Sequence, residues 1–231
     1  MMKQEFFQID AIPAVLYGEA SDRVWLFIHG KCGCKEEGAA FAEIVCPKGA
    51  QVLAIDLPEH GARRDEAGFD PWHIVPELRA VMRNAKARWP HVNLRANSIG
   101  AWFSLIAFAD MPVERALLVS PILDMKKLIE SMMAQAAVDE ERLRREGEVP
   151  TNFGETLSWR YLQYVRAHPV SSCPASVHLL YAGHDSMTAR DTADAFVRRF
   201  HCGLTTMEDG EHWFHTPKQL AFLAAWEDAY T

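Results

Sequence analysis

Three residues whose side chains could together perform nucleophilic chemistry occur along the chain in the order Ser98, Asp185 and His212. A serine hydroxyl is a poor nucleophile until a base removes its proton, and the base needs a third group to orient it. A histidine imidazole and a carboxylate can fill these two roles. The three residues are therefore candidates for a catalytic triad in which Ser98 attacks an acyl group.

The sequence around Ser98 is typical of a sharp turn between a strand and a helix. It reads Arg95-Ala-Asn-Ser-Ile-Gly-Ala101, between an apolar run and a helical pattern that is apolar almost all round. In a nucleophile elbow, G-x-S-x-G, backbone strain lifts the serine hydroxyl above the sheet, and the positions two before and two after it must be small. Ala96 and Gly100 occupy them, so alanine replaces the usual first glycine and still meets the steric requirement. The alternative is that Ser98 is only a helix N-cap.

Asp185 and His212 each follow an apolar run near the end of the chain. Both are expected in loops at the carboxyl edge of a sheet, the same edge as Ser98, and they follow the serine in the required order. Two alternatives remain open. Asp124 could replace Asp185 as the orienting carboxylate. We prefer Asp185, because in chains with a nucleophile elbow the acid normally follows the strand that corresponds to the one before Asp185. His215 could replace His212, but it directly precedes the N-cap of the final helix.

Acyl transfer also requires backbone N–H groups that stabilise the developing negative charge. We expect one such group from Ile99, at the start of the helix, and one from Lys31, in the loop that follows the first buried strand. His29 is interpreted as a residue that shapes this loop, with a second catalytic imidazole as the alternative. Residues expected to contact the substrate are Gly30, Cys32 and Trp213.

The elements that would position these residues are short apolar runs that alternate with amphipathic stretches. Near-continuous runs are typical of strands buried on both faces of a parallel sheet, so the alternation predicts an α/β fold with right-handed crossovers and helices on both faces. The expected strands cover 24–29, 51–56, 92–97, 115–120, 177–182 and 204–208, with possible antiparallel edge strands at 6–9 and 14–17. The expected helices cover 36–45, 71–89, 98–110 and 189–201, and a last one begins at Pro217 after an N-cap at Thr216.

One segment interrupts this alternation. From about residue 123 to 170 there are two helical patterns, 126–145 and 155–167, with no strand between them. We interpret the chain as a single domain, 1–231, with this segment as a helical cap inserted between two strands. Its charged run is either a solvated face or part of a mobile lid over the site.

Length, composition and charge exclude several classes of protein. A chain of 231 residues with 49% hydrophobic and 24% charged residues is neither disordered nor of low complexity. Its net charge of −7 gives no electrostatic footprint for nucleic acid. The longest strongly apolar stretch, 101–109, is half of a membrane span, and no secretory signal is visible at the start. We expect a cytoplasmic protein without stable membrane association; the sequence does not predict its oligomeric state.

The chain contains five cysteines, which we expect to be reduced thiols. Cys32 and Cys34 form a C-x-C pair that could clip a zinc ion, but no second pair stands nearby at ligand spacing. We therefore expect neither a metal nor a cofactor.

At these motifs the sequence resembles the α/β-hydrolase family over essentially its whole length. The matching segments are His29-Gly30, Asp56-Leu-Pro-Glu-His-Gly61 with Glu59 where glycine is usual, the elbow at Ser98, Gly183-His-Asp185, and Gly210-Glu-His212-Trp-Phe. The resemblance implies the α/β-hydrolase fold and a serine hydrolase that forms an acyl-enzyme. It assigns Ser98 as the nucleophile, His212 as general base and acid, and Asp185 as the group that orients the histidine.

The small size and short insertion look like the esterase and lysophospholipase-like branch of that family. We therefore expect cleavage of carboxylic esters or thioesters of small molecules, and the apolar residues of the insertion favour an apolar acyl group. Two alternatives remain: a non-catalytic member of the fold that binds a small molecule, and an acyltransferase or amidase that uses the same triad.

Overall fold

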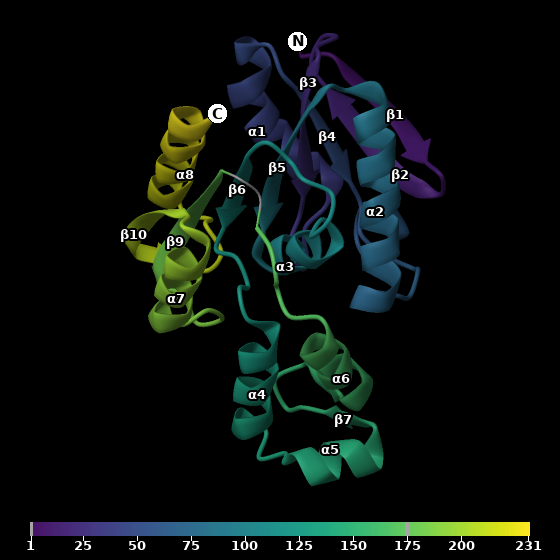
Figure 1. Cartoon of the computed structure of the whole chain (residues 1–231), viewed down its shortest axis with the longest axis vertical. Coiled ribbons are helices and arrows are strands. Elements are labelled where there is room, and N and C mark those ends of the chain that lie inside the picture. Colours follow the sequence, from purple (N-terminus) through teal and green to yellow (C-terminus); the bar gives the residue numbers. More distant parts are fainter. Residues whose placement is uncertain (1, 174–175) are drawn as a thin grey trace.

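The computed structural model describes residues 2–173 and 176–231. Over these residues, eight strands form one sheet, in the order β1-β2-β4-β3-β5-β6-β9-β10 (Figure 1). The strands are β1 (Gln4–Ile9), β2 (Ile12–Tyr17), β3 (Arg23–Ile28), β4 (Gln51–Ile55), β5 (His91–Asn97), β6 (Ala116–Val119), β9 (Val177–His184) and β10 (Gly203–Glu211). The six strands from β4 through β10 in this order are parallel to one another, whereas β1 and β2 pair antiparallel at one edge. This arrangement confirms the predicted parallel sheet and the antiparallel edge strands.

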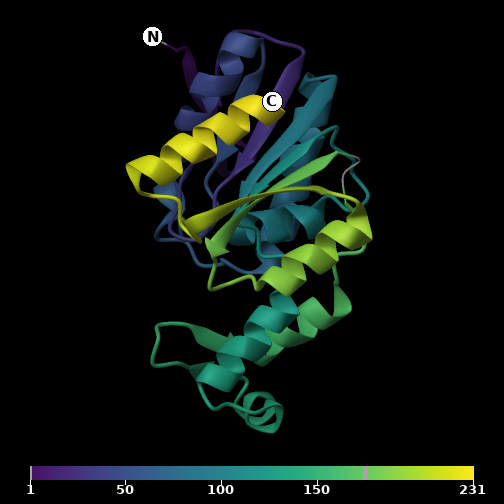
Figure 2. The ribbon, with the colours of Figure 1, turned by 90° about the vertical axis from the view of Figure 1, so that its left-hand side faces the viewer.

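The central strands are buried because helices cover both faces of the sheet (Figure 2). On one face lie α1 (Gly38–Val45) and α8 (Pro217–Tyr230). On the other lie α2 (Pro71–Arg88), α3 (Ser98–Ala107) and α7 (Arg190–Phe200). Alternate residues of the central strands therefore enter two separate hydrophobic cores, one beneath each helical layer. This is why the strands read as continuous apolar runs rather than as alternating ones.

The last helix begins as its sequence predicts. The Thr216 hydroxyl accepts a hydrogen bond from the Gln219 N–H at 3.3 Å, and the Gln219 side chain accepts one from the Thr216 N–H at 3.3 Å. With Pro217 in the first turn, this capping box fixes where α8 starts. The loop that carries His212 is thereby anchored at its carboxyl end.

The segment between β6 and β9 differs from its prediction. It contains α4 (Met125–Gln135), α5 (Glu140–Glu146) and α6 (Trp159–Ala167), with a two-stranded hairpin of β7 (Glu148–Pro150) and β8 (Thr156–Ser158) before α6. The expected continuous helix over 126–145 and the expected absence of a strand are both wrong. Ala137, at φ 52°, breaks the helix, and Asp139 then caps α5 by accepting from the Arg142 N–H at 2.7 Å. Gly147, at φ 77°, ends α5 and starts the hairpin.

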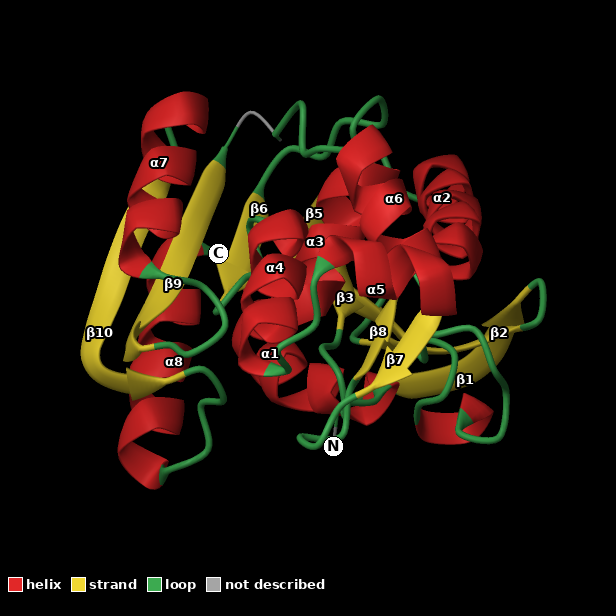
Figure 3. Ribbon diagram, turned by 90° about the horizontal axis from the view of Figure 1, so that it is seen from below, coloured by secondary structure: helices red, strands yellow, loops and turns green. Residues whose placement is uncertain are grey.

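This inserted segment, residues 123–170, projects below the main body in Figure 1, on the side opposite both chain termini. Seen from below in Figure 3, its helices and the β7–β8 hairpin lie in front of the sheet, under the carboxyl ends of the strands. Among the described residues, no helix is both long enough and apolar enough to cross a bilayer.

Candidate active site

The turn between β5 and α3 has the strained geometry that its sequence predicts. Ser98 adopts φ 47°, in the left-handed region that a residue with a side chain rarely occupies. The strand ends at Asn97 and the helix begins at Ser98 itself, so no residue is left to relax the turn. Ala96, two residues before Ser98 where glycine is usual, is fully buried. The backbone therefore places the Ser98 side chain at the carboxyl edge of the sheet.

Ser98, His212 and Asp185 form a hydrogen-bonded chain across this edge. Asp185 directly follows β9 and His212 directly follows β10. The Ser98 Oγ lies 2.8 Å from His212 Nε2, and His212 Nδ1 lies 2.9 Å from both carboxylate oxygens of Asp185. Since Nδ1–H donates to the carboxylate, Nε2 is left as the acceptor for the serine proton. This is the arrangement in which a histidine can act as a base toward serine.

The Asp185 carboxylate is itself held in place. Its side chain is fully buried, and its Oδ1 accepts hydrogen bonds from the N–H groups of Met187 at 2.7 Å and Thr188 at 3.0 Å. The Thr188 hydroxyl then donates to the carbonyl of Pro121 at 2.8 Å, which ties this loop to the chain that leaves β6. The orientation of the carboxylate is therefore fixed before any proton moves.

Both alternative triad members are occupied elsewhere. The Asp124 carboxylate caps α4 by accepting from the Lys127 N–H at 3.0 Å. His215 Nδ1–H donates to the carbonyl of Trp213 at 2.8 Å. The structure thus joins Asp185 and His212, and neither alternative, to Ser98.

The loop after β3 packs directly against the elbow. A Cβ atom at Gly30 would lie only 3.2 Å from the Ser98 Cβ, so the loop backbone runs alongside the serine. The next residue, Lys31, has an N–H group with no hydrogen-bond partner among the described residues. The Ile99 N–H lies in the first turn of α3, where N–H groups have no partner within the helix. Both N–H groups are therefore left without a backbone acceptor among the described residues.

Two buried histidines give this loop its shape. His29 is fully buried; its Nδ1–H donates to the Gly30 carbonyl at 2.7 Å, and its Nε2 accepts from the Leu57 N–H at 3.0 Å. Burial lowers the pKa of His29 to about 4, so the ring is neutral at neutral pH. Both of its ring nitrogens are engaged by backbone groups rather than by Ser98. The interpretation of His29 as a shaping residue fits these contacts, and a second catalytic imidazole does not.

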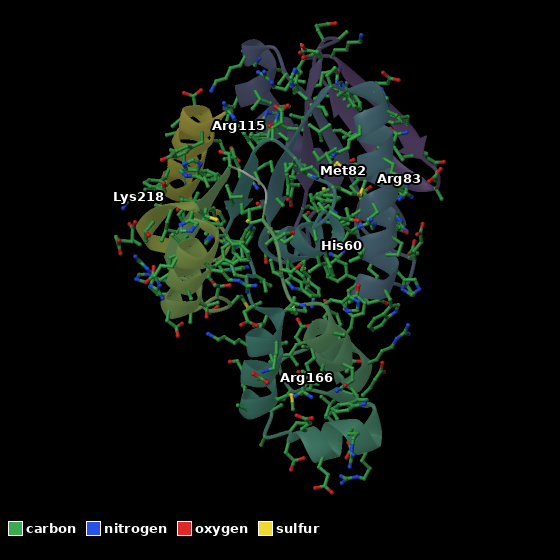
Figure 4. All side chains as sticks on the ribbon, viewed as in Figure 1. His60, Met82, Arg83, Arg115, Arg166 and Lys218 are labelled. Atoms are coloured by element: carbon green, nitrogen blue, oxygen red, sulfur yellow. The ribbon has the colours of Figure 1, made fainter. Side chains whose placement is uncertain are left out.

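The second histidine is His60, which Figure 4 labels beside α3. Its Nε2 accepts from the Cys32 N–H at 2.8 Å, and its Nδ1–H donates to the Pro58 carbonyl at 2.8 Å. The Cys32 backbone, at φ 66°, is held in the left-handed region by this bond. Its N–H is consequently unavailable to a substrate, unlike that of Lys31.

The loop that carries His60 is anchored by a buried ion pair. The Asp56 carboxylate accepts from the Lys35 ammonium at 2.8 Å, the Lys35 N–H at 2.8 Å and the Ala62 N–H at 2.9 Å. Burial alone would raise the pKa of Asp56, but these donors outweigh it and hold the pKa below its ordinary value. Asp56 therefore stays ionised and fixes the loop from residue 56 to 62.

Of the three residues expected to contact a substrate, one lies against Ser98 and two are exposed. Gly30 lies against Ser98, whereas the Cys32 side chain is exposed at the rim of the loop. Trp213, next to His212, is 74% exposed, and its ring stacks on that of His215 with centroids 4.8 Å apart. Its indole, apart from the contact with His215, is therefore largely exposed.

An ion pair behind the elbow was not foreseen from the sequence. Arg95, on β5, is 3% exposed, and its Nε donates to the Glu227 carboxylate of α8 at 2.6 Å. Its guanidinium also donates to the side-chain oxygen of Asn97, the residue before Ser98. The available signal in the sequence was a charged residue within an expected buried strand, because such a residue needs a buried partner.

A second unforeseen contact joins the insertion to the site. The Lys31 ammonium donates to the Glu155 carboxylate, at the tip of the β7–β8 hairpin, over 2.5 Å. Both side chains are about half exposed. The side chain that follows Gly30 in the loop thus reaches the insertion.

Nothing among the described residues groups three or more His, Cys, Asp or Glu side chains closely enough to hold a metal ion. Cys32 and Cys34 are free thiols in the structure.

Solved structures share this fold along nearly the whole chain, although at low identity. Est1E from Butyrivibrio proteoclasticus superposes with a TM-score of 0.77 at 17% identity, covering 98% of this chain and 96% of Est1E. Mouse α/β hydrolase domain-containing protein 10 gives 0.75 at 14% identity, covering 98% and 97%. An α/β serine hydrolase without a lid from Xanthomonas campestris gives 0.63 at 15% identity, covering 99% and 92%. No family model matches the sequence, and neither does any curated protein. The similarity to these structures confirms the fold expected from the sequence: the chain has the α/β-hydrolase fold.

Proposed function

We propose that the protein is a serine hydrolase that cleaves carboxylic esters or thioesters of small molecules. The observation that carries the proposal is the chain of hydrogen bonds from the Ser98 hydroxyl through His212 to the buried Asp185 carboxylate. A serine that only capped a helix would need neither the histidine nor the strained backbone at φ 47°.

The proposed reaction proceeds in two halves. Ser98 Oγ attacks the carbonyl carbon while its proton passes to His212 Nε2, and Asp185 stabilises the imidazolium that forms. The N–H groups of Ile99 and Lys31 stabilise the negative oxygen of the tetrahedral intermediate. Collapse of this intermediate expels the alcohol or thiol, which takes the proton from His212 and leaves an acyl-Ser98. A water molecule then gives a proton to His212 Nε2 and attacks the acyl carbon. Collapse of this second tetrahedral intermediate breaks the bond to Ser98 Oγ, which takes the proton back from His212, and the acid is released.

The similar structures support an ester or thioester as the substrate. Est1E is known with ferulic acid bound, and a thioesterase domain from the curacin biosynthetic pathway shares the fold with a TM-score of 0.60 at 16% identity. Both esters and thioesters pass through the same kind of tetrahedral intermediate.

The surroundings of the triad support an apolar acyl group. Met187 and Trp213 are exposed large apolar residues, two residues from Asp185 and one from His212, respectively. The contact between Lys31 and Glu155 supports a role for the insertion as a cap over the site. We therefore expect esters with longer apolar acyl chains to be better substrates than acetate.

The test is the intact mass of the protein after exposure to a fluorophosphonate probe. We expect a single adduct on the wild type, no adduct on Ser98→Ala, and an unchanged adduct on Ser186→Ala, which removes an exposed serine next to Asp185. A series of p-nitrophenyl esters from acetate to decanoate then tests the acyl preference. A folded wild type that forms no adduct and cleaves no ester would refute the proposal and favour a non-catalytic binding protein.

A further inference from the structure

A cavity of about 380 Å³ lies where the insertion joins the main body, apart from the triad. Both segments that connect the insertion to the body line it, together with one residue of α3 and one face of α7. None of Ser98, Asp185 and His212 belongs to its walls. A cavity of this size is large enough for a small organic ligand.

One part of the wall is apolar. Its main contributors are Trp102, Leu123, Met125, Val170, Phe196 and Phe200. Four of them are less than 7% exposed, which marks this part as an extension of the hydrophobic core. Water in contact with such a surface is displaced favourably by an apolar ligand.

Half of the remaining lining residues are basic, although the whole chain carries a net charge of −7. The basic residues are Lys126, Lys127, Arg166, His168 and Arg199. Asp124 is the acidic residue of the wall, and its carboxylate already accepts the Lys127 N–H. The positive charge of this wall is thus not balanced within the cavity.

Two of the basic side chains are neutralised by partners outside the cavity. Lys126 pairs with Glu130 at 3.0 Å. Arg166, which Figure 4 labels in the insertion, makes a two-pronged contact with Glu140 at 2.7 and 2.6 Å. Neither cation needs a ligand.

Lys127 and Arg199 differ, because within the described part of the chain neither has a carboxylate within 4.0 Å. The Lys127 ammonium donates to the Thr192 hydroxyl at 3.1 Å. The Arg199 guanidinium lies 4.7 Å from the centre of the Phe200 ring. Since Lys127 is on α4 and Arg199 is on α7, the two cations approach the cavity from the insertion and from the body.

We propose that this cavity binds a small organic monoanion with an apolar body, such as a medium-chain carboxylate. The apolar body fills the space between Trp102 and Phe196, and the anionic group meets Lys127 and Arg199. The inference rests on this cavity and not on the proposed reaction, although the acid that the reaction would release belongs to the same chemical class.

The test is calorimetric titration of the full chain with three ligands of equal length: octanoate, octanol and octylammonium. We expect octanoate to bind about tenfold more tightly than octanol, since a charge-assisted contact is added, and octylammonium to bind more weakly than either. Equal affinity for the three ligands, or no binding of octanoate, would overturn the proposal.

Two variants locate the site. In Ala195→Trp, an indole placed at an exposed position of the wall fills the cavity, and we expect octanoate binding to be lost. In Lys127→Met with Arg199→Met, we expect the preference for octanoate over octanol to disappear while octanol still binds. The matched control, Arg198→Met with Lys218→Met, removes two charges from exposed positions outside the cavity and leaves the preference intact.

If octanoate binds Ala195→Trp as tightly as it binds the wild type, it occupies another site, such as the one at Ser98. This result would also overturn the proposal. Thermal melts of each variant establish that it is folded. If Ala195→Trp does not fold, Lys127→Met with Arg199→Met tests the proposal instead. This double variant is expected to fold, because methionine keeps the apolar stems of both side chains. An octanoate preference that survives in it contradicts the proposed anion contact.

Discussion

A Cβ atom placed on Gly100 would lie 2.2 Å from the carbonyl oxygen of His29. These two residues belong to the elbow and to the loop after β3, so their contact sets how closely the loop backbone approaches the elbow at Ser98. The obstructing atom is backbone and cannot rotate away. The glycine two residues after the serine is therefore required by the neighbouring strand as well as by the turn itself.

Replacing Gly100 by alanine is expected to separate the elbow from the loop. A displacement of about 1 Å between reacting groups costs on the order of a hundredfold in rate, so ester cleavage and fluorophosphonate labelling should both fall by about that factor. Overpacking should also lower the free energy of unfolding by about 1–3 kcal/mol. Initial rates and urea melts measure the two effects.

The matched control for this variant is Gly147→Ala. Gly147 has open space around its Cβ position but φ 77°, so alanine there costs stability through the backbone alone. We expect a loss of stability with full activity. If Gly100→Ala keeps the labelling rate of Gly147→Ala, the spacing argument is wrong.

Replacing Asp185 by asparagine should lower kcat by about 10³–10⁴-fold, because an amide neither fixes the imidazole tautomer nor stabilises its positive form. The variant Asp124→Asn is the comparison, since this carboxylate only caps α4, and it should stay within about twofold of wild type. Steady-state kinetics on one ester measure both. Equal losses in the two variants would contradict the assignment of Asp185.

The ion pair between Arg95 and Glu227 is expected to position the elbow through Asn97. Arg95→Met alone leaves a buried carboxylate without a partner and should cost about 3–5 kcal/mol of stability. Arg95→Met combined with Glu227→Leu should regain most of that stability, because a well-packed apolar pair replaces the ions. Its kcat should nevertheless remain about tenfold low with KM unchanged, since Asn97 still lacks its donor.

The double variant thus separates the contribution of the ion pair to stability from its effect on the position of the elbow. Chemical denaturation measures the stability, and kcat and KM measure the effect on the elbow. If the stable double variant has the kcat of the wild type, Arg95 and Glu227 contribute to stability alone and do not position the elbow.

Acidification should destabilise the fold through His29. The folded-state pKa of about 4 lies below the ordinary value of 6.5, so the unfolded chain binds more protons between these pH values. The free energy of unfolding should therefore fall as the pH drops from about 6.5 to about 4, by about 3 kcal/mol in total. Urea melts at several pH values measure the slope, which His29→Gln should flatten and His184→Gln, at an exposed position, should not.

The strands that position the site could be predicted because helices cover both of their faces. The run at 51–56 is apolar between Gln51 and Asp56, and that at 92–97 alternates apolar with polar residues. The strands β4 and β5 lie there within one residue at each end. The order of Ser98, Asp185 and His212 along the chain likewise led us to expect them at one edge, where the structure joins them by hydrogen bonds. Their catalytic roles remain a prediction.

The features that could not be predicted from the sequence are short strands and ion pairs between residues far apart along the chain. The strands β7 and β8 have three residues each, too few for a period of two to stand out. The pairs Arg95–Glu227 and Lys31–Glu155 join residues 132 and 124 positions apart. No local pattern encodes such a partner, and the charge of Arg95 within a buried strand could have indicated only that a partner was needed.

Ser98 and His212, which share a hydrogen bond, follow strands at different places in the sheet. Ser98 follows β5, which has strands on both sides, whereas His212 follows β10, the last strand of the sheet, which pairs only with β9. Edge strands open locally at lower free energy than central ones. Fraying of β10 would therefore carry the imidazole away while the elbow keeps its shape, and the share of molecules with a reactive serine would report how often this outer strand is closed.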